Sequence, residues 1–170
     1  MSGIAAFFVA VAAFVAMEPV TAATHRWVMH GIGERLHRSH HRSPSADRPP
    51  SRFETNDWYP VIFAALVNVG FYAGLNWDGF AGLVPVGVGV TAYGMSYALV
   101  HDVYIHGRLG SFAQGRIAAF DRLADAHRIH HLYNEAPYGM LVPIVPSELR
   151  TRAARTQRDP FGRRNLDAVR

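Results

Sequence analysis

The 170-residue sequence contains no cysteine and no lysine. Without cysteine the chain can form no disulfide and offers no thiolate to a metal, to an iron–sulfur cluster or to nucleophilic catalysis. Without lysine it cannot form a Schiff base through a lysine side chain, and all 17 basic residues are arginine. Charged residues amount to only 18%, against roughly 25% in a typical soluble domain. This deficit disfavours both a soluble globular protein and a disordered one.

Charge is missing altogether from three segments of the chain, residues 1–17, 58–77 and 79–100. A helix needs about 20 mainly apolar residues to cross the hydrocarbon core of a bilayer. The two later segments reach that length, and so does 4–24, in which Glu18 is the single charged residue. Only Asp78 and Gly79 separate the second and third runs, which predicts a tight helical hairpin. We therefore predict an all-α integral membrane bundle with three membrane helices.

Arginine is confined to residues 25–57 and to the chain beyond Ile105. Because basic residues flank membrane helices on the cytoplasmic side, both regions are expected in the cytoplasm, with the hairpin tip outside. A signal peptide would begin with basic residues, and residues 1–24 contain none. We expect residues 1–146 to form the membrane-embedded domain and residues 147–170, with seven arginines, to form a flexible basic tail.

All ten histidines fall into four short boxes. The spacing HxxxxH followed by HxxHH occurs twice along the chain. The boxes are His25 and His30; His37, His40 and His41; His101 and His106; and His127, His130 and His131. Each pair of boxes begins where an apolar run meets an arginine-containing region. The sequence therefore predicts a histidine-rich cap at the cytoplasmic surface of the membrane.

The number and spacing of these histidines indicate metal binding. Within an HxxHH box, positions i, i+3 and i+4 lie on one side of a helix, which brings three imidazoles together. A single interior histidine is more often a hydrogen-bonded core residue than a ligand, but ten unpaired imidazoles would be costly to bury. We predict that all ten bind metal, and ten nitrogens suffice for two ions. Imidazole suits zinc, copper, iron or nickel, so the spacing leaves the metal open.

Three acidic residues are candidates for supporting the metal ligands. A carboxylate can orient a ligating imidazole through its second ring N–H. We assign this role to Asp102, which follows His101, and to Asp125, two residues before His127. Glu18 interrupts an apolar run, so it is either a functional acid at membrane depth or a structural partner between helices.

The segments HRWVMHG, HRSHH, HDVYIHG and AHRIHH resemble the boxes of the bacterial β-carotene hydroxylases, of the fatty acid hydroxylase and sterol desaturase superfamily. The resemblance covers residues 14–145. It implies a non-haem di-iron membrane monooxygenase that uses O₂ to hydroxylate the 3-carbon of β-ionone rings, converting β-carotene to β-cryptoxanthin and zeaxanthin. Members of the family are often drawn with four membrane helices, so a fourth is the alternative to the three predicted here.

The resemblance also implies a set of ligands and partners. The histidines of all four boxes would bind two iron ions, and electrons would come from a ferredoxin and an NAD(P)H-dependent reductase. The substrate would be a carotenoid in the lipid of a bacterial inner membrane, with the boxes on the cytoplasmic side and no nucleic-acid partner. Two alternatives stay open: a related sterol or fatty-acyl hydroxylase or desaturase, and a non-enzymatic membrane protein that binds haem or zinc.

Overall fold

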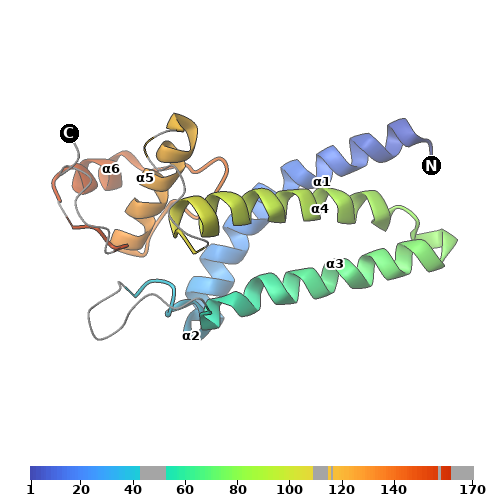
Figure 1. Ribbon diagram of the computed structural model, residues 1–170, viewed down its shortest axis with the longest axis horizontal. Coiled ribbons are helices and arrows are strands. Elements are labelled where there is room, and N and C mark those ends of the chain that lie inside the picture. Colours follow the sequence, from blue (N-terminus) through green and yellow to red (C-terminus); the bar gives the residue numbers. More distant parts are fainter. Residues whose placement is uncertain (43–52, 109–114, 116, 157, 162–170) are drawn as a thin grey trace.

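The computed structural model describes residues 1–42, 53–108, 115, 117–156 and 158–161. Every regular element in these residues is a helix (Figure 1). In chain order the elements are α1 (Gly3–Ala23), the π-helix η1 (Thr24–Ile32), α2 (Glu34–His37), η2 (Thr55–Asp57), α3 (Trp58–Asn76), η3 (Asp78–Phe80), α4 (Leu83–Ala98), the π-helix η4 (Leu99–Ile105), α5 (Ala118–Tyr133) and α6 (Ser147–Ala154). The predicted all-α fold is confirmed.

Three continuous helical segments are long and apolar enough to cross a membrane: Gly3–Ile32, Thr55–Asn76 and Leu83–Ile105. We call them the spans. In the second and third, α3 and α4 form a hairpin joined through η3, as the sequence predicts (Figure 1). Within the described residues there are three such segments and not four. The protein is therefore a membrane protein with three helices able to span the bilayer.

The helix α4 packs against both α1 and α3. A glycine sets how closely α1 and α4 approach, since a Cβ atom at Gly89 would lie 2.1 Å from the carbonyl oxygen of Ala10. A Cβ atom at Gly74 would lie 2.9 Å from the side chain of Val84, within the hairpin. Small residues at such crossings are typical of helices packed in lipid, where close backbone approach supplies much of the contact.

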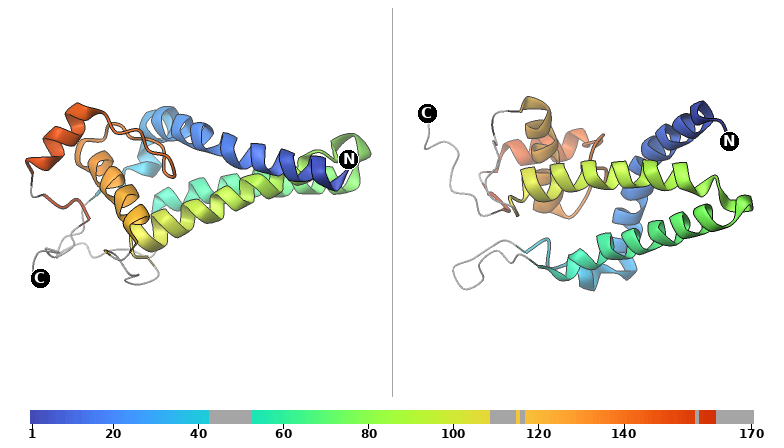
Figure 2. Two further views of the ribbon diagram at one scale, coloured as in Figure 1. Left: turned by 90° about the horizontal axis from the view of Figure 1, so that it is seen from above. Right: turned by 45° about the vertical axis from the view of Figure 1, so that its right-hand side comes forward.

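The elements η1, α2, η4, α5 and α6 all lie toward the end of the bundle opposite the hairpin turn (Figure 1). We call this end the cap. One small core in the cap joins Val100, Tyr104 and Ile105 to Met140, and a second joins Ile129 of α5 to α6. The segment 134–146 between α5 and α6 runs back along α1 (Figure 2).

The beginning of the predicted tail is helical. Residues 147–170 are predicted to be a solvated tail, but Ser147–Ala154 forms α6, whose Leu149 and Ala153 are buried. These two apolar residues stand one helical turn apart among arginines, and together they form a stripe that packs on α5. This part of the chain is therefore helical and anchored to α5 by one apolar stripe, while its arginines stay exposed. Residues 162–170 lie outside the described part, and the domain boundary at residue 146 stays a prediction.

Candidate metal centre

The ten histidines converge in the cap as two clusters. In each of two groups, candidate ligand atoms lie within 4.8 Å of one another. The first cluster contains His25, His30, His37, His41 and His130. The second contains His40, His106, His127 and His131. We add His101 to the second cluster, because its Nε2 lies 3.0 Å from Nε2 of His40.

Both HxxHH boxes are divided between the two clusters. In α5, His127 and His131 belong to the second cluster, whereas His130 belongs to the first. Positions i and i+4 are separated by only about 40° around a helix, and position i+3 lies about 60° away on the other side. The second box is divided in the same way, with His40 as the residue that crosses over. The three imidazoles of a box are therefore close together, as expected, but they belong to two sites.

His25 and His30 lie in the π-helix η1, and His101 lies in the π-helix η4, which His106 directly follows. In an α-helix, positions i and i+5 would stand about 140° apart. A π-helix instead forms hydrogen bonds from i+5 to i, which places these two residues on the same side. The backbone N–H of His106 donates to the carbonyl of His101 at 2.9 Å, and the two rings lie 4.6 Å apart. The rings of His25 and His30 lie 5.0 Å apart. The π-helices therefore bring both histidines of each box to the centre.

In the first cluster, the outer ring nitrogens of three histidines face neutral acceptors. The pairs are His25 Nδ1 with the Tyr138 carbonyl at 3.1 Å, His37 Nδ1 with Asn56 Oδ1 at 2.6 Å, and His130 Nδ1 with the Glu135 carbonyl at 2.6 Å. Because an oxygen acceptor needs a donor, each of these rings carries its proton on Nδ1. A neutral ring of this kind keeps a lone pair on Nε2 for a metal.

In the second cluster, the outer ring nitrogens of two histidines face carboxylates. Nδ1 of His101 lies 3.0 Å from Oδ1 of Asp102, and Nδ1 of His40 lies 3.5 Å from Oε2 of Glu54. These carboxylates also favour a proton on Nδ1 and a lone pair on Nε2. The two clusters thus present the same inner nitrogen, but their outer partners differ in charge.

The inner Nε2 atoms lie at distances typical of ligands on a shared ion. The pairs in the first cluster are His25–His37 at 3.1 Å, His37–His41 at 3.0 Å, His41–His130 at 3.2 Å and His30–His130 at 3.1 Å. Those in the second are His40–His101 at 3.0 Å, His40–His131 at 3.2 Å, His127–His131 at 2.9 Å and His106–His127 at 3.2 Å. Nitrogens about 2.1 Å from one ion and at right angles lie about 3 Å apart. Each cluster therefore fits one metal ion.

Several histidines of the two clusters are hard to protonate. Burial lowers the pKa of His37 to about 3, against the opposing effect of the Asn56 hydrogen bond, and lowers that of His41 to about 2. It lowers the pKa of His40 to about 4, although Glu54 favours the protonated form. At neutral pH these rings are uncharged, which is the state that binds a metal. That all ten histidines ligate metal stays a prediction, and the structure brings all ten together.

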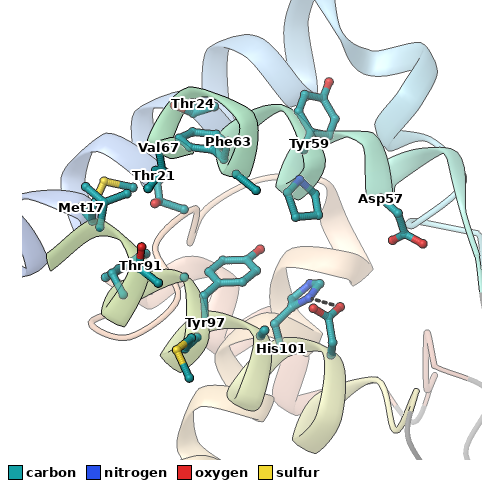
Figure 3. Close-up of a pocket in the computed structure, with 18 of the residues that line it drawn as sticks. Met17, Thr21, Thr24, Asp57, Tyr59, Phe63, Val67, Thr91, Tyr97 and His101 are labelled. Carbon is teal, nitrogen blue, oxygen red and sulfur yellow. Dashed lines mark hydrogen bonds and ion pairs between the residues drawn. The ribbon is translucent and has the colours of Figure 1, made fainter. Parts of the chain in front are cut away.

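A cavity of about 530 Å³ lies between the spans and reaches the second cluster (Figure 3). Most of its lining is apolar, with Met17, Phe63 and Val67 contributed by α1 and α3. At its inner end it meets His101, whose ring lies 4.9 Å from that of Tyr97. An apolar molecule in this cavity would therefore approach the centre from the membrane side.

The model of one protein family, fatty acid hydroxylase, matches residues 10–149. The chain belongs to the fatty acid hydroxylase family. It is 36% identical over 126 residues to the β-carotene hydroxylase of Paracoccus sp. (strain PC1), covering 74% of each protein. It is 41% identical to that of Pseudescherichia vulneris and 32% identical to β-carotene hydroxylase 1, chloroplastic, of Capsicum annuum. The two matches cover 69% and 84% of this chain.

The chain spans 62% of the Pseudescherichia relative and 44% of the Capsicum relative. No solved structure matches it. The resemblance to bacterial β-carotene hydroxylases, inferred from the histidine boxes, is confirmed by these comparisons. The family assignment also covers the whole of the region that contains the four boxes.

Asp102 and Asp125, two of the acids predicted to support the histidines, have different hydrogen-bond partners. Asp102 bonds to His101, as the sequence predicts. Asp125 instead accepts two hydrogen bonds from Arg128, at 3.2 and 3.0 Å, and its side chain is 48% exposed. Two residues along a helix correspond to about 200° of rotation, so Asp125 points away from His127. Among the described contacts Asp125 has none with a histidine, so the structure offers no direct route for its predicted supporting role.

Glu18 has the structural role that its sequence position left open. Its carboxylate accepts hydrogen bonds from the backbone N–H groups of Leu141 and Val142, at 3.1 and 2.9 Å. It also accepts one from the hydroxyl of Tyr93 on α4, at 2.6 Å. Glu18 thus fastens the segment 134–146 to the spans. In that segment the Tyr138 carbonyl holds His25, which links Glu18 to the first cluster.

Four of the groups that support the histidines are not predicted from the sequence. Glu54 and Asn56 lie directly before α3, where a polar run meets an apolar one. That position was a usable signal, because the polar run comes to the same membrane boundary as the boxes. The carbonyl groups of Tyr138 and Glu135 have no signal in the sequence, since every residue carries one.

Proposed function

We propose that this protein is a membrane monooxygenase that hydroxylates the 3-carbon of the β-ionone rings of carotenoids, forming β-cryptoxanthin and zeaxanthin from β-carotene. The observation that carries the proposal is the apolar cavity that leads from between the spans to the histidine clusters. The identity of 36% and 41% to bacterial β-carotene hydroxylases supports the choice of substrate.

Each cluster would hold one iron ion through the Nε2 atoms of its histidines, in agreement with the all-imidazole donor set. With O₂, iron supplies an oxidant strong enough for an unactivated C–H bond, which no protein side chain provides. The outer partners keep the ring protons on Nδ1 and so hold each lone pair toward the ion. The apolar lining of the cavity excludes water and orients the hydrocarbon ring toward His101.

One hydroxylation with O₂ consumes two electrons and two protons, because the second oxygen atom leaves as water. The chain has no cysteine for an iron–sulfur cluster, so the electrons must come from another protein. We propose a ferredoxin with an NAD(P)H-dependent reductase as that source. Arg35, Arg38 and Arg42 are exposed on the cap and would attract an acidic donor.

We also propose that the cap faces the cytoplasm of a bacterium and that the spans cross its inner membrane. The distribution of arginine supports this orientation. A reporter fused after Gln157 should be active in the cytoplasm, and one inserted at Asp78 should be active in the periplasm. A cytoplasmic signal from Asp78 would contradict the orientation.

The decisive experiment is expression in a bacterium that accumulates β-carotene, followed by chromatography of the pigments. We expect zeaxanthin from the wild-type chain and none from a His127→Ala variant inserted to the same level. Elemental analysis of anaerobically purified protein should find about two irons per chain, one for each cluster. Unchanged β-carotene together with hydroxylated or desaturated sterols or fatty acids would overturn the carotenoid assignment, and a haem spectrum would overturn the non-haem centre.

A further inference from the structure

A single arginine joins three carboxylates beside the second cluster. Arg108 follows the third histidine box, and its guanidinium binds Asp57 through two contacts, at 2.6 and 3.1 Å. The same group lies 3.5 Å from Asp102 and 3.8 Å from Glu54. Its side chain is 18% exposed. The planar, two-pronged guanidinium suits such a bidentate contact, and partial burial strengthens the attraction.

Two of these carboxylates also touch the second cluster. Asp102 holds Nδ1 of His101, and Glu54 lies beside Nδ1 of His40. Arg108 therefore contacts no histidine nitrogen in these interactions but reaches two of them through one intervening carboxylate each. Without its positive charge, three neighbouring carboxylates would repel one another and move apart. Their positions against the imidazoles thus depend on the guanidinium.

Among the described residues, no carboxylate bonds to an outer nitrogen of the first cluster. Its hydrogen-bond acceptors are the carbonyl groups of Tyr138 and Glu135 and the side-chain amide of Asn56, all of them neutral. Glu34 lies near His30 but is paired with Arg38, and both side chains are more than half exposed. A carboxylate that accepts the Nδ1–H bond makes the imidazole a stronger ligand than a neutral acceptor does. Two clusters with similar inner geometry therefore differ in the strength of their ligands.

We propose that Arg108 is a positioning residue that holds Asp102 and Glu54 against His101 and His40, and so makes the second cluster the tighter of the two metal sites. This inference rests on the proposed metal centre. It adds that the two metal positions are unequal and names the residue that causes the inequality.

The test measures metal release rather than activity. Full-length protein with two bound Fe²⁺ ions, in lipid nanodiscs and without oxygen, is mixed with an excess of a chromogenic iron(II) chelator. We expect two phases of about equal amplitude, the slower one from the second cluster. A His37→Ala variant, which lacks a ligand of the first cluster, should lose the fast phase and keep the slow one.

Arg108→Gln should accelerate the slow phase by about 10-fold or more and leave the fast phase unchanged, because lost support weakens a metal site by about 10–100-fold. Arg108→Lys should accelerate the slow phase less than Arg108→Gln does, since lysine keeps the charge but cannot form the bidentate contact. Asp102→Asn should accelerate the same phase, which provides a second route if Arg108→Gln fails to insert. Arg128→Gln is the matched control, because Arg128 pairs with Asp125, and both of its phases should equal those of wild type.

Three results would overturn the inference: release of both irons in a single phase, equal acceleration of both phases by Arg108→Gln, or no change in either. These outcomes differ from a failure of the proposed function. If wild-type protein held no iron at all, the metal centre itself would be contradicted.

Discussion

In the spans large apolar side chains point outward, whereas in the cap polar side chains point inward. Phe7 and Phe8 of α1 are both 64% exposed, and α1 contains no buried residue. In the cap, by contrast, His130 is fully buried and His127 is only 4% exposed. The spans can expose apolar groups because their surroundings are hydrocarbon. Several of the buried imidazoles have an oxygen acceptor on Nδ1, and the proposed metal ions would bind their Nε2 atoms. We therefore expect the two regions to be stabilised by different partners, lipid in one and metal in the other.

The largest expected effect comes from removing one metal ligand of the cap. His131→Ala deletes a nitrogen that lies 2.9 Å from that of His127, and no neighbouring ring is placed to replace it. Hydroxylation should fall below detection, while the spans still insert because they do not depend on the metal. The measurement is zeaxanthin formed per membrane-inserted chain. Substantial remaining activity would show that the second cluster does not need this ligand.

Acid should unfold the metal-free cap before it affects the spans. The folded-state pKa is about 3 for His37 and about 4 for His40, whereas an unfolded histidine has a pKa of about 6.5. Between these values the unfolded state binds more protons, so the stability of the cap is full above about pH 6.5 and falls as the pH is lowered toward 4.

Hydrogen exchange of metal-free protein can measure this difference between the regions. Protection of α5 should fall from pH 7 to pH 4.5, after correction for the intrinsic exchange rate, while protection of α3 stays constant. Iron-loaded protein is the control and should keep its protection over more of this range, because bound metal stabilises the neutral rings. Equal loss of protection in α3 and α5 would argue against separate sources of stability.

A smaller effect is expected from crowding the contact between two spans. Gly89→Ala would place a methyl group 2.1 Å from the Ala10 carbonyl, which forces α1 and α4 apart and should cost about 1–3 kcal/mol. Thermal unfolding in detergent should therefore begin at a lower temperature. Gly70→Ala on α3 is the matched control, because a Cβ atom there has no neighbour within 4 Å. If both variants unfolded alike, the close approach at Gly89 would not matter for stability.

The smallest effect is expected from Asp125→Asn, on the outer side of α5. Its partner Arg128 and the residue itself are both partly exposed, and such ion pairs contribute little. Hydroxylation should stay within about twofold of wild type. Asp102→Asn, assayed in parallel, should lower it by about 10-fold because Asp102 supports a histidine of the centre. A larger loss in the Asp125 variant than in the Asp102 variant would show that Asp125 supports the centre despite its distance from the histidines.

The sequence by itself determined the three spans and the four boxes. A run of about 20 uncharged residues is a local property, and it predicts a membrane helix whatever the rest of the chain does. The hairpin at Asp78 and Gly79 follows in the same way from two adjacent runs. The repeated histidine spacing pointed to metal and to the hydroxylase family, because few other structures require ten imidazoles in that pattern.

Only the tertiary structure decided which histidine joins which cluster. His30 and His130 are 100 residues apart, and their nitrogens lie 3.1 Å from each other. The approach of α5 to η1 leaves no trace in the spacing, and the HxxxxH spacing matches a π-helical turn only once the backbone is seen to adopt one. The outer partners depend on the same packing: Asp125, close in sequence, turns away, while Glu54 comes from before another span. Distances between separate segments depend on how the spans pack, so the sequence could name the ligands but not pair them.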